Sequence, residues 1–176
     1  MFILSMKKLN VYDFCLIALL ASVQYAIFVF FSNILYLEMI TFTIVLFAMT
    51  FDRYQCVWGS IVFGLLMLCL NGVNFWNMMY VFIYPIYSLI INILKDHLVK
   101  HKLVLSFVCG FLSFLTGQLL QLPFMLFSKK VTLIYIIMGL KTSIIQGVLS
   151  FLVCWLLFER VNRILEKLRR SKWRSF

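Results

Sequence analysis

Residues 139–158 read GLKTSIIQGVLSFLVCWLLF, and the basic segment ERVNRILEKLRRSKWRSF follows directly at 159–176. The first stretch contains 20 residues, and a helix needs about 20 apolar residues to cross the hydrocarbon core of a bilayer. The second stretch carries seven Lys and Arg residues against two Glu residues. Basic residues near the end of a span are retained on the cytoplasmic side. We therefore expect a last transmembrane helix at about 139–158 and a basic cytoplasmic tail at 159–176.

The composition identifies the class of protein. Hydrophobic residues make up 64% of the 176 residues, charged residues make up 12%, and the mean hydropathy is +1.04. Soluble domains contain roughly 45–50% apolar and about 25% charged residues. The sequence therefore predicts an all-α integral membrane protein with a single transmembrane domain over 1–176. The net charge of +10 does not indicate a nucleic-acid partner, because most basic residues lie near span ends, where they suit contact with membrane lipid.

Apolar runs predict six transmembrane helices in one bundle, with both termini in the cytoplasm. On this topology, 13 of the 16 basic residues lie on the inner side, and only Lys129, Lys130 and Lys141 lie outside. Such an imbalance is typical of a multi-pass protein of the cell membrane. The first run is longer than the roughly 7–15 residues of a signal-peptide core, so we expect it to be retained, with Met6 as an alternative start to Met1. The expected spans are about 11–31, 35–51, 56–70, 76–94, 103–122 and 139–158.

The start of the last span is open to two interpretations. Residues 131–138 are apolar, and they either extend this span outward or form a loop over the outer mouth of the bundle. The longer helix would place Lys141 about two turns deep, and an unpaired Lys inside hydrocarbon costs roughly 2.5–3.5 kcal/mol. We therefore favour a helix that begins at Gly139, with Lys141 in its first turn.

Small residues recur every four positions in several spans. Rows of this kind let helix backbones approach closely, which drives helix packing within lipid. Most are explained by packing inside the bundle, as for Ser60 and Gly64, or Ser113 and Gly117. For the first span a sharper possibility is a smooth face kept for a separate partner protein. That row consists of Ala18, Ser22 and Ala26.

Polar and aromatic groups gather at one predicted depth, toward the outer ends of several spans. An interfacial aromatic belt accounts for Trp76, and hydrogen bonds between helices account for isolated amides. Tyr84 lies too deep for a belt, because seven residues of helix span about 10 Å. Several spans that offer amides and phenols at one level are better explained by a cavity for a polar, partly aromatic molecule. The candidate substrate-binding residues are Asn71, Asn74, Trp76, Asn77, Tyr80, Tyr84, Gln118, Gln121 and Lys141.

The residues give little support to metal binding, cofactor binding or catalysis. His97 and His101 are four apart, but they lie in a solvated charged loop. The segment that begins at Gly139 resembles the end of a phosphate-binding loop without its upstream glycine or preceding strand. We therefore expect no metal, no cofactor and no enzymatic activity in this chain.

Coupling to protons or ions also finds little support on this topology. Glu38 is placed at the outer ends of the first two spans, and the other five acidic residues lie near the inner boundary. No carboxylate is then expected at the middle of the membrane, where a coupling site belongs.

A basic protein of this size with six spans resembles the substrate-binding S component of energy-coupling factor (ECF) vitamin transporters. The resemblance rests on the topology, on the small residues Ala18, Ser22 and Ala26, and on the opening Gly-Leu-Lys-Thr-Ser of the last span. It implies a bacterial membrane protein that binds a vitamin or related micronutrient near its outer face. It further implies that the small residues contact a transmembrane coupling subunit, and that two ATPase subunits drive delivery. Ser22 departs from the family's usual Ala-xxx-Ala pair.

Two other functions compete with this interpretation. A structural scaffold of the rod-shape-determining type would also be small, many-spanned and without catalysis, and it predicts a filled bundle with no outer cavity. A small lipid or drug exporter would need a carboxylate embedded in the membrane. The identity of the vitamin is left open, with riboflavin, folate, pantothenate, pyridoxine, thiamine, biotin and cobalamin as candidates.

Overall fold

The computed structural model describes residues 10–34 and 37–172, without the side chains of 170–172. Both candidate starts, Met1 and Met6, lie outside these residues. The described chain is mostly helical and contains no strand. Five of its helices are long and apolar enough to cross a membrane, and α2 is shorter. The elements are α1 (Val11–Phe31), α2 (Ile40–Thr50), α3 (Arg53–Asn71), α4 (Phe75–Leu98), α5 (Lys102–Leu119), the 3₁₀ turn η1 (Leu122–Leu126) and α6 (Lys129–Lys172).

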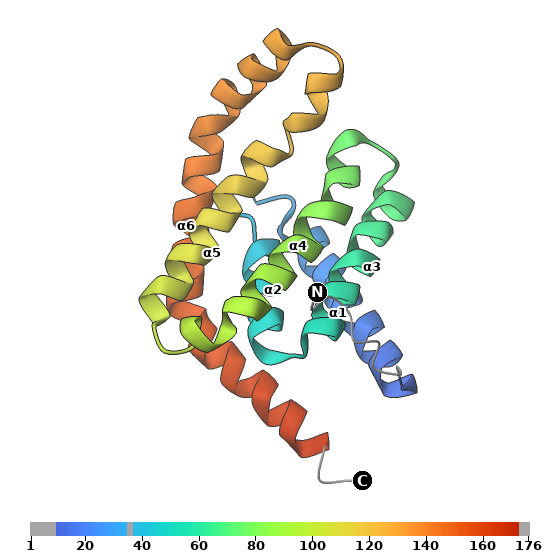
Figure 1. Ribbon diagram of the computed structural model, residues 1–176, viewed down its shortest axis with the longest axis vertical. Coiled ribbons are helices and arrows are strands. Elements are labelled where there is room, and N and C mark those ends of the chain that lie inside the picture. Colours follow the sequence, from blue (N-terminus) through green and yellow to red (C-terminus); the bar gives the residue numbers. More distant parts are fainter. Residues whose placement is uncertain (1–9, 35–36, 173–176) are drawn as a thin grey trace.

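The short helix α2 lies in the middle of the molecule, surrounded by the longer helices (Figure 1). All eleven of its residues are buried. At 1.5 Å per residue it is about 16 Å long, well short of the roughly 30 Å hydrocarbon core. The sequence predicted a longer span over 35–51. The difference arises because residues 37–39 are not helical, so the helix begins only at Ile40.

Side chains from other parts of the chain satisfy both ends of α2. At its N-terminus, the backbone N–H of Thr41 donates to Glu38 Oε1 at 2.9 Å. At its C-terminus, Asn92 on α4 donates to the Ala48 carbonyl at 3.0 Å, and Arg169 on α6 donates to the Thr50 carbonyl at 2.5 Å. The terminal backbone groups of a helix have no partner within it, so a buried short helix depends on such external partners.

Two helical hairpins flank α2, and small residues form the contact within each (Figure 1). In α3–α4, a Cβ added to Gly64 would lie 2.7 Å from the Val81 Cα. In α5–α6, a Cβ added to Gly110 would lie 2.7 Å from the Gly147 carbonyl oxygen, and Gly117 faces Ser143 just as closely. The small-residue rows predicted for these spans therefore pack helix against helix inside the molecule.

Helix α1 packs against α3 through its buried side. Leu20 lies against Gly59, and Gln55 donates a 2.8 Å hydrogen bond to Asp13. The opposite side of α1 is different, because its small-residue row is exposed. That row is Ala18, Ser22 and Ala26.

Helix α6 begins at Lys129, ten residues before the expected Gly139. Its 44 residues correspond to about 66 Å at 1.5 Å per residue. The preference for a later start rested on the cost of burying Lys141, but Lys141 is exposed on the surface of α6. A long basic side chain on such a face extends its charge toward water, and residues 131–138 contain nothing that breaks a helix.

The segment expected as a separate tail continues α6 as far as Lys172. Its inner face packs beneath α2, where Asn162 bonds Thr50 at 2.8 Å. Arg169 also reaches Asp52 in the turn between α2 and α3, at 3.4 Å. As far as Arg169, this segment therefore contacts the C-terminal end of α2 and the turn that follows it.

Candidate functional site

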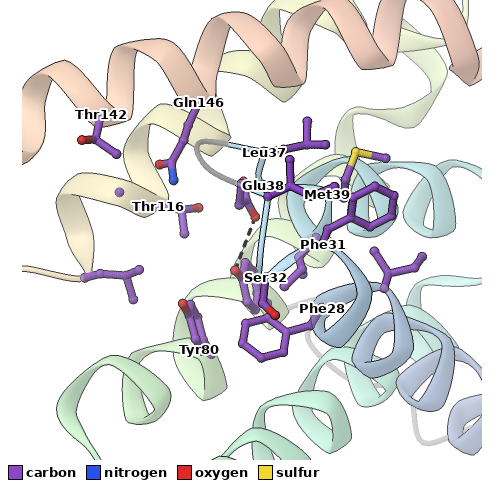
Figure 2. A pocket seen from close by; sticks show the side chains of 16 residues that line it. Phe28, Phe31, Ser32, Leu37, Glu38, Met39, Tyr80, Thr116, Thr142 and Gln146 are labelled. Carbon is purple, nitrogen blue, oxygen red and sulfur yellow. Dashed lines mark hydrogen bonds between the residues drawn. The ribbon is translucent and has the colours of Figure 1, made fainter.

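A partly open cavity of about 610 Å³ lies between the helices, next to the N-terminus of α2 (Figure 2). The second half of α1, the segment leading into α2, and parts of α4, α5 and α6 enclose it. Its volume falls within the roughly 300–1,000 Å³ typical of small-molecule sites. The lining residues are Ile27, Phe28, Phe31, Ser32, Ile34, Leu37, Glu38, Met39, Ile40, Tyr80, Tyr84, Thr116, Gly117, Leu120, Thr142 and Gln146.

The carboxylate of Glu38 is the only acidic group among these lining residues. One of its oxygens, Oε1, accepts hydrogen bonds from the Thr41 backbone N–H at 2.9 Å and the Thr41 hydroxyl at 2.8 Å. The other, Oε2, accepts a 2.6 Å hydrogen bond from Ser113 on α5. A longer contact of 3.5 Å joins Oε1 to the Tyr84 hydroxyl (dashed in Figure 2).

The structure adds detail to the expectation for Glu38. The sequence predicts a position at the outer ends of the first two spans, and Glu38 lies just before the first residue of α2, Ile40. It is half-buried and bonded to α4 and α5 as well as to α2. The reason is that α2 is short, so the segment before it extends into the bundle instead of ending at its surface. Glu38 is therefore an acidic residue in contact with several helices.

Ser150 connects α6 to the same group. Its hydroxyl lies 2.9 Å from the Ser113 hydroxyl and 3.1 Å from the Glu38 carbonyl oxygen. Ser113 and Ser150 are both buried. The hydroxyls of two helices thus converge on Glu38, and the carboxylate holds α2, α5 and α6 in one hydrogen-bonded cluster.

Two tyrosines of α4 form an aromatic wall of the cavity. The rings of Tyr80 and Tyr84 are stacked, with centroids 5.1 Å apart and an angle of 9° between the planes. They lie four residues apart and therefore on one face of the helix. Phe63 packs against the far side of this pair, with its ring centroid 5.7 Å from that of Tyr84. Tyr84 is 1% exposed and Tyr80 is half-buried, so Tyr80 presents more of its ring to the cavity.

The remaining walls differ in polarity. Thr116, Thr142 and Gln146 lie on one side of the cavity, contributed by α5 and α6, as Figure 2 shows. Phe28 and Phe31 of α1 lie on the other side. A mostly apolar enclosure with a few converging polar groups is typical of a site for a small organic molecule.

Of the nine predicted substrate-binding residues, Tyr80 and Tyr84 line this cavity. The three asparagines lie together at the α3–α4 turn and stabilise it. Asn74 accepts from the Asn77 backbone N–H at 2.8 Å, and the Asn77 amide donates to the Gly72 carbonyl at 2.8 Å. Asn71 contacts the sulfur of Met67 at 3.3 Å. Their proximity arises from the turn, where Gly72 adopts a positive φ of 83°.

The other four predicted residues are spread around the α5–α6 hairpin and its neighbourhood. Trp76 is exposed and packs against Phe124 of η1, with ring centroids 5.7 Å apart. Gln118 donates to Ser143 at 2.7 Å, which is a contact between helices. Gln121 is half-buried, and Lys141 is exposed. The structure places none of these four in the cavity wall.

Sequence reasoning missed the acidic group at the centre of the site. The available signal was that Glu38 stands within an apolar stretch, ILYLEMITF at 34–42, with no basic residue nearby in sequence. An acidic residue without a compensating charge in such a stretch is a reason to suspect function. Gln146 was interpreted as an isolated amide that bonds between helices, and Thr116 and Thr142 were missed because a single threonine in an apolar helix carries no distinct signal.

Within the described part of the chain, no group of three or more His, Cys, Asp or Glu residues is placed to hold a metal ion. Comparison of the chain with protein-family models, with curated proteins and with solved structures found no match.

Proposed function

We propose that this protein is the substrate-binding membrane subunit of an importer of the ECF type. It captures a vitamin or related micronutrient in the cavity beside Glu38. A transmembrane coupling subunit and two ATPase subunits, all separate chains, then drive delivery. The observation that carries the proposal is a partly open cavity of about 610 Å³ between the helices that combines an aromatic wall with a carboxylate. By the distribution of basic residues, this cavity opens toward the outside and both termini lie in the cytoplasm.

The exposed face of α1 supports a partner in the membrane. The small residues of α1 are exposed, whereas Gly64, Gly110 and Gly117 lie at close contacts between helices. The Ser22 hydroxyl is satisfied within its own helix by the Ala18 carbonyl at 2.8 Å. Such a face allows close approach of another helix, which is how transmembrane helices associate.

The cavity also weighs against the scaffold alternative. A scaffold that works only through flat contacts with partners has no need of a hollow of this size between its helices. A polar space lined by Glu38, Thr116 and Gln146 is instead suited to a ligand.

A proton-coupled carrier is a second candidate, and the position of Glu38 favours it. Ionisable residues buried among transmembrane helices form the proton relays of pumps and transporters. Such a carrier would work alone in the membrane, whereas the subunit proposed above needs its partner chains. Uptake by the purified chain in proteoliposomes, driven by a pH gradient alone and lost in Glu38→Gln, would establish the carrier instead.

The test of the proposed function is ligand binding at the cavity. The detergent-purified chain is screened against riboflavin, folate, pantothenate, pyridoxine, thiamine, biotin and cobalamin by thermal shift, and bound ligand is sought by native mass spectrometry. We expect one vitamin to stabilise the protein. Ser32→Trp, which fills the cavity from its edge, should abolish the shift, while Asn33→Trp, next to it and outside the lining, should retain it. A chain that binds none of them and carries no ligand would favour the scaffold.

A further inference from the structure

We infer that the ligand of this cavity is an organic cation, with a protonated amine or a quaternary nitrogen placed between Glu38 and the ring of Tyr80. The inference rests on the proposed function and names its substrate class. It is argued from the hydrogen bonds of the carboxylate, from the charges that line the cavity and from the aromatic wall.

The hydrogen bonds show how the carboxyl group of Glu38 is held at the cavity wall. The Ser113 hydroxyl is 2.6 Å from Oε2, a distance typical of a hydrogen bond between two oxygens. The Thr41 backbone N–H donates to Oε1 at 2.9 Å, and the Thr41 hydroxyl lies 2.8 Å from the same oxygen. Ser113 and Thr41 therefore fix both oxygens of the group in position.

The negative charge has no full counter-charge inside the described part of the protein. No Lys, Arg or His lines the cavity, and the three ion pairs among the described residues involve Asp52 and Glu159 instead of Glu38. The N-terminus of α2 contributes the equivalent of about half a positive charge. A cationic ligand beside Glu38 would supply the positive charge that the lining residues lack.

The carboxylate also has bonding capacity toward the cavity. An ionised carboxylate accepts about four hydrogen bonds, about two at each oxygen. Oε2 accepts only the bond from Ser113 in the described structure, and the Tyr84 contact to Oε1 is long at 3.5 Å. The carboxyl group can therefore accept a further bond from a ligand N–H without displacing the bonds that hold α2.

The aromatic wall favours the same charge. The face of a tyrosine ring attracts a cation within about 6 Å of its centroid, most strongly where water is excluded. Tyr80 lies across the cavity from Glu38 in Figure 2. Tyr84 stacks behind it and holds its orientation. The apolar side chains of Phe28 and Phe31 then suit the uncharged body of the ligand.

The first arm of the test uses the unmodified full-length chain in detergent and compares ligands that differ in charge. Pyridoxamine and pyridoxine share a ring and differ at one substituent, an amine or a hydroxyl. Thiamine is a second cation, riboflavin is neutral and pantothenate is an anion. We expect a cation to bind, and pyridoxamine to bind about tenfold or more tightly than pyridoxine if that ring is accepted, which corresponds to about 1.4 kcal/mol.

The second arm uses variants with matched controls. Glu38→Gln keeps the shape of the side chain and removes its charge, and should weaken cation binding by about tenfold or more. Tyr80→Leu leaves the carboxylate and its bonds intact, and should weaken it by about threefold or more. The controls are Glu159→Gln on the exposed part of α6 and Tyr135→Leu, both outside the cavity, and neither should change the affinity. If Glu38→Gln does not fold, the Tyr80 variant and the charge comparison still decide the outcome.

The outcomes separate the inference from the proposed function. A cation that binds, and whose affinity falls in Glu38→Gln or Tyr80→Leu but not in the controls, supports both. A neutral or anionic vitamin that binds more tightly than the cations, with unchanged affinity in Tyr80→Leu, overturns the inference and leaves the proposed function standing. Absence of binding by any of the seven vitamins and pyridoxamine overturns both.

Discussion

Ser113 on α5 donates a 2.6 Å hydrogen bond to the carboxylate of Glu38, the residue just before the first turn of α2. Ser150 on α6 completes the cluster from the other side, 2.9 Å from Ser113. The bond lies at the wall of the cavity, and it joins the central short helix to the α5–α6 hairpin. Any displacement of the α5–α6 hairpin relative to α2 has to break or rearrange this hydrogen bond. A ligand that contacts Glu38 would therefore also affect the arrangement of these helices.

Removal of this hydroxyl should destabilise the fold. We expect Ser113→Ala to lower the free energy of unfolding by about 1–3 kcal/mol, because it removes a buried hydroxyl that bonds both Glu38 and Ser150. The measurement is the Tm of the purified protein in detergent. Ser22→Ala is the matched control, since its hydroxyl bonds only the Ala18 carbonyl of its own exposed turn. Equal Tm values for the two variants would contradict this account of Glu38.

The contact between α5 and α6 should depend on Gly110. An added Cβ would lie 2.7 Å from the backbone oxygen of Gly147 and 3.0 Å from the Cβ of Phe151, and backbone cannot move aside as a flexible side chain can. We expect Gly110→Ala to cost about 1–3 kcal/mol. Gly139→Ala, on the same hairpin, would meet only Gln121, 3.8 Å away, and should be neutral or stabilising because Ala favours the helix by about 1 kcal/mol. Thermal unfolding of both variants tests the difference, and a lower Tm for Gly139→Ala than for Gly110→Ala would refute it.

Much of the helical architecture could be predicted from hydrophobic runs and small residues. The expected spans over 11–31, 76–94 and 103–122 correspond to α1, α4 and α5 within a few residues. The rows around Gly64 and Gly117 do lie at helix contacts. These features are local: an apolar run of sufficient length forms a helix in lipid, because its backbone groups have no other partners.

The short central helix could not be predicted, because its length depends on its neighbours. Residues 35–51 are apolar apart from Tyr36, Glu38 and three threonines, and no glycine or proline among them marks Ile40 as the start of a helix. That start depends on Glu38, which also bonds Ser113, 75 residues later in the chain. The position of the carboxylate follows from tertiary contacts. The lengths of the predicted spans give no information about such contacts.

The predicted binding residues also divide into those identified by a local pattern and those whose surroundings depend on tertiary contacts. Tyr80 and Tyr84 were chosen because they continue one face of a helix, and that face does line the cavity. Asn71, Asn74 and Asn77 were chosen for their common depth. Predicted depth does not distinguish amides that face a cavity from amides that stabilise a turn. In the structure these three residues lie at the turn between α3 and α4 and form hydrogen bonds there.

The end of α6 should hold the turn between α2 and α3 in place. Arg169 donates to the Thr50 carbonyl at 2.5 Å and reaches Asp52 at 3.4 Å. We expect Arg169→Ala to accelerate hydrogen exchange of the backbone amides over residues 50–56, because that turn loses its external partner. Arg163→Ala is the control, since Arg163 contacts only Glu159 on its own helix among the bonds of its side chain. Protection over 50–56 that is unchanged in Arg169→Ala would show that the α6 end is dispensable there.

The exposed row of α1 should be required for transport and dispensable for binding. We expect Ser22→Leu combined with Ala26→Leu to leave the ligand affinity of the purified chain unchanged, because neither residue lines the cavity or the bundle core. Bulky side chains on this row should prevent a partner helix from approaching closely, so energy-dependent uptake in cells should fall toward background. Val23→Leu is the control, since Val23 is also exposed on α1 but lies outside the row. The measurement pairs a binding assay in detergent with uptake of the same labelled ligand by cells that express each variant. Uptake by the double variant at the level of Val23→Leu would show that no partner docks on this face.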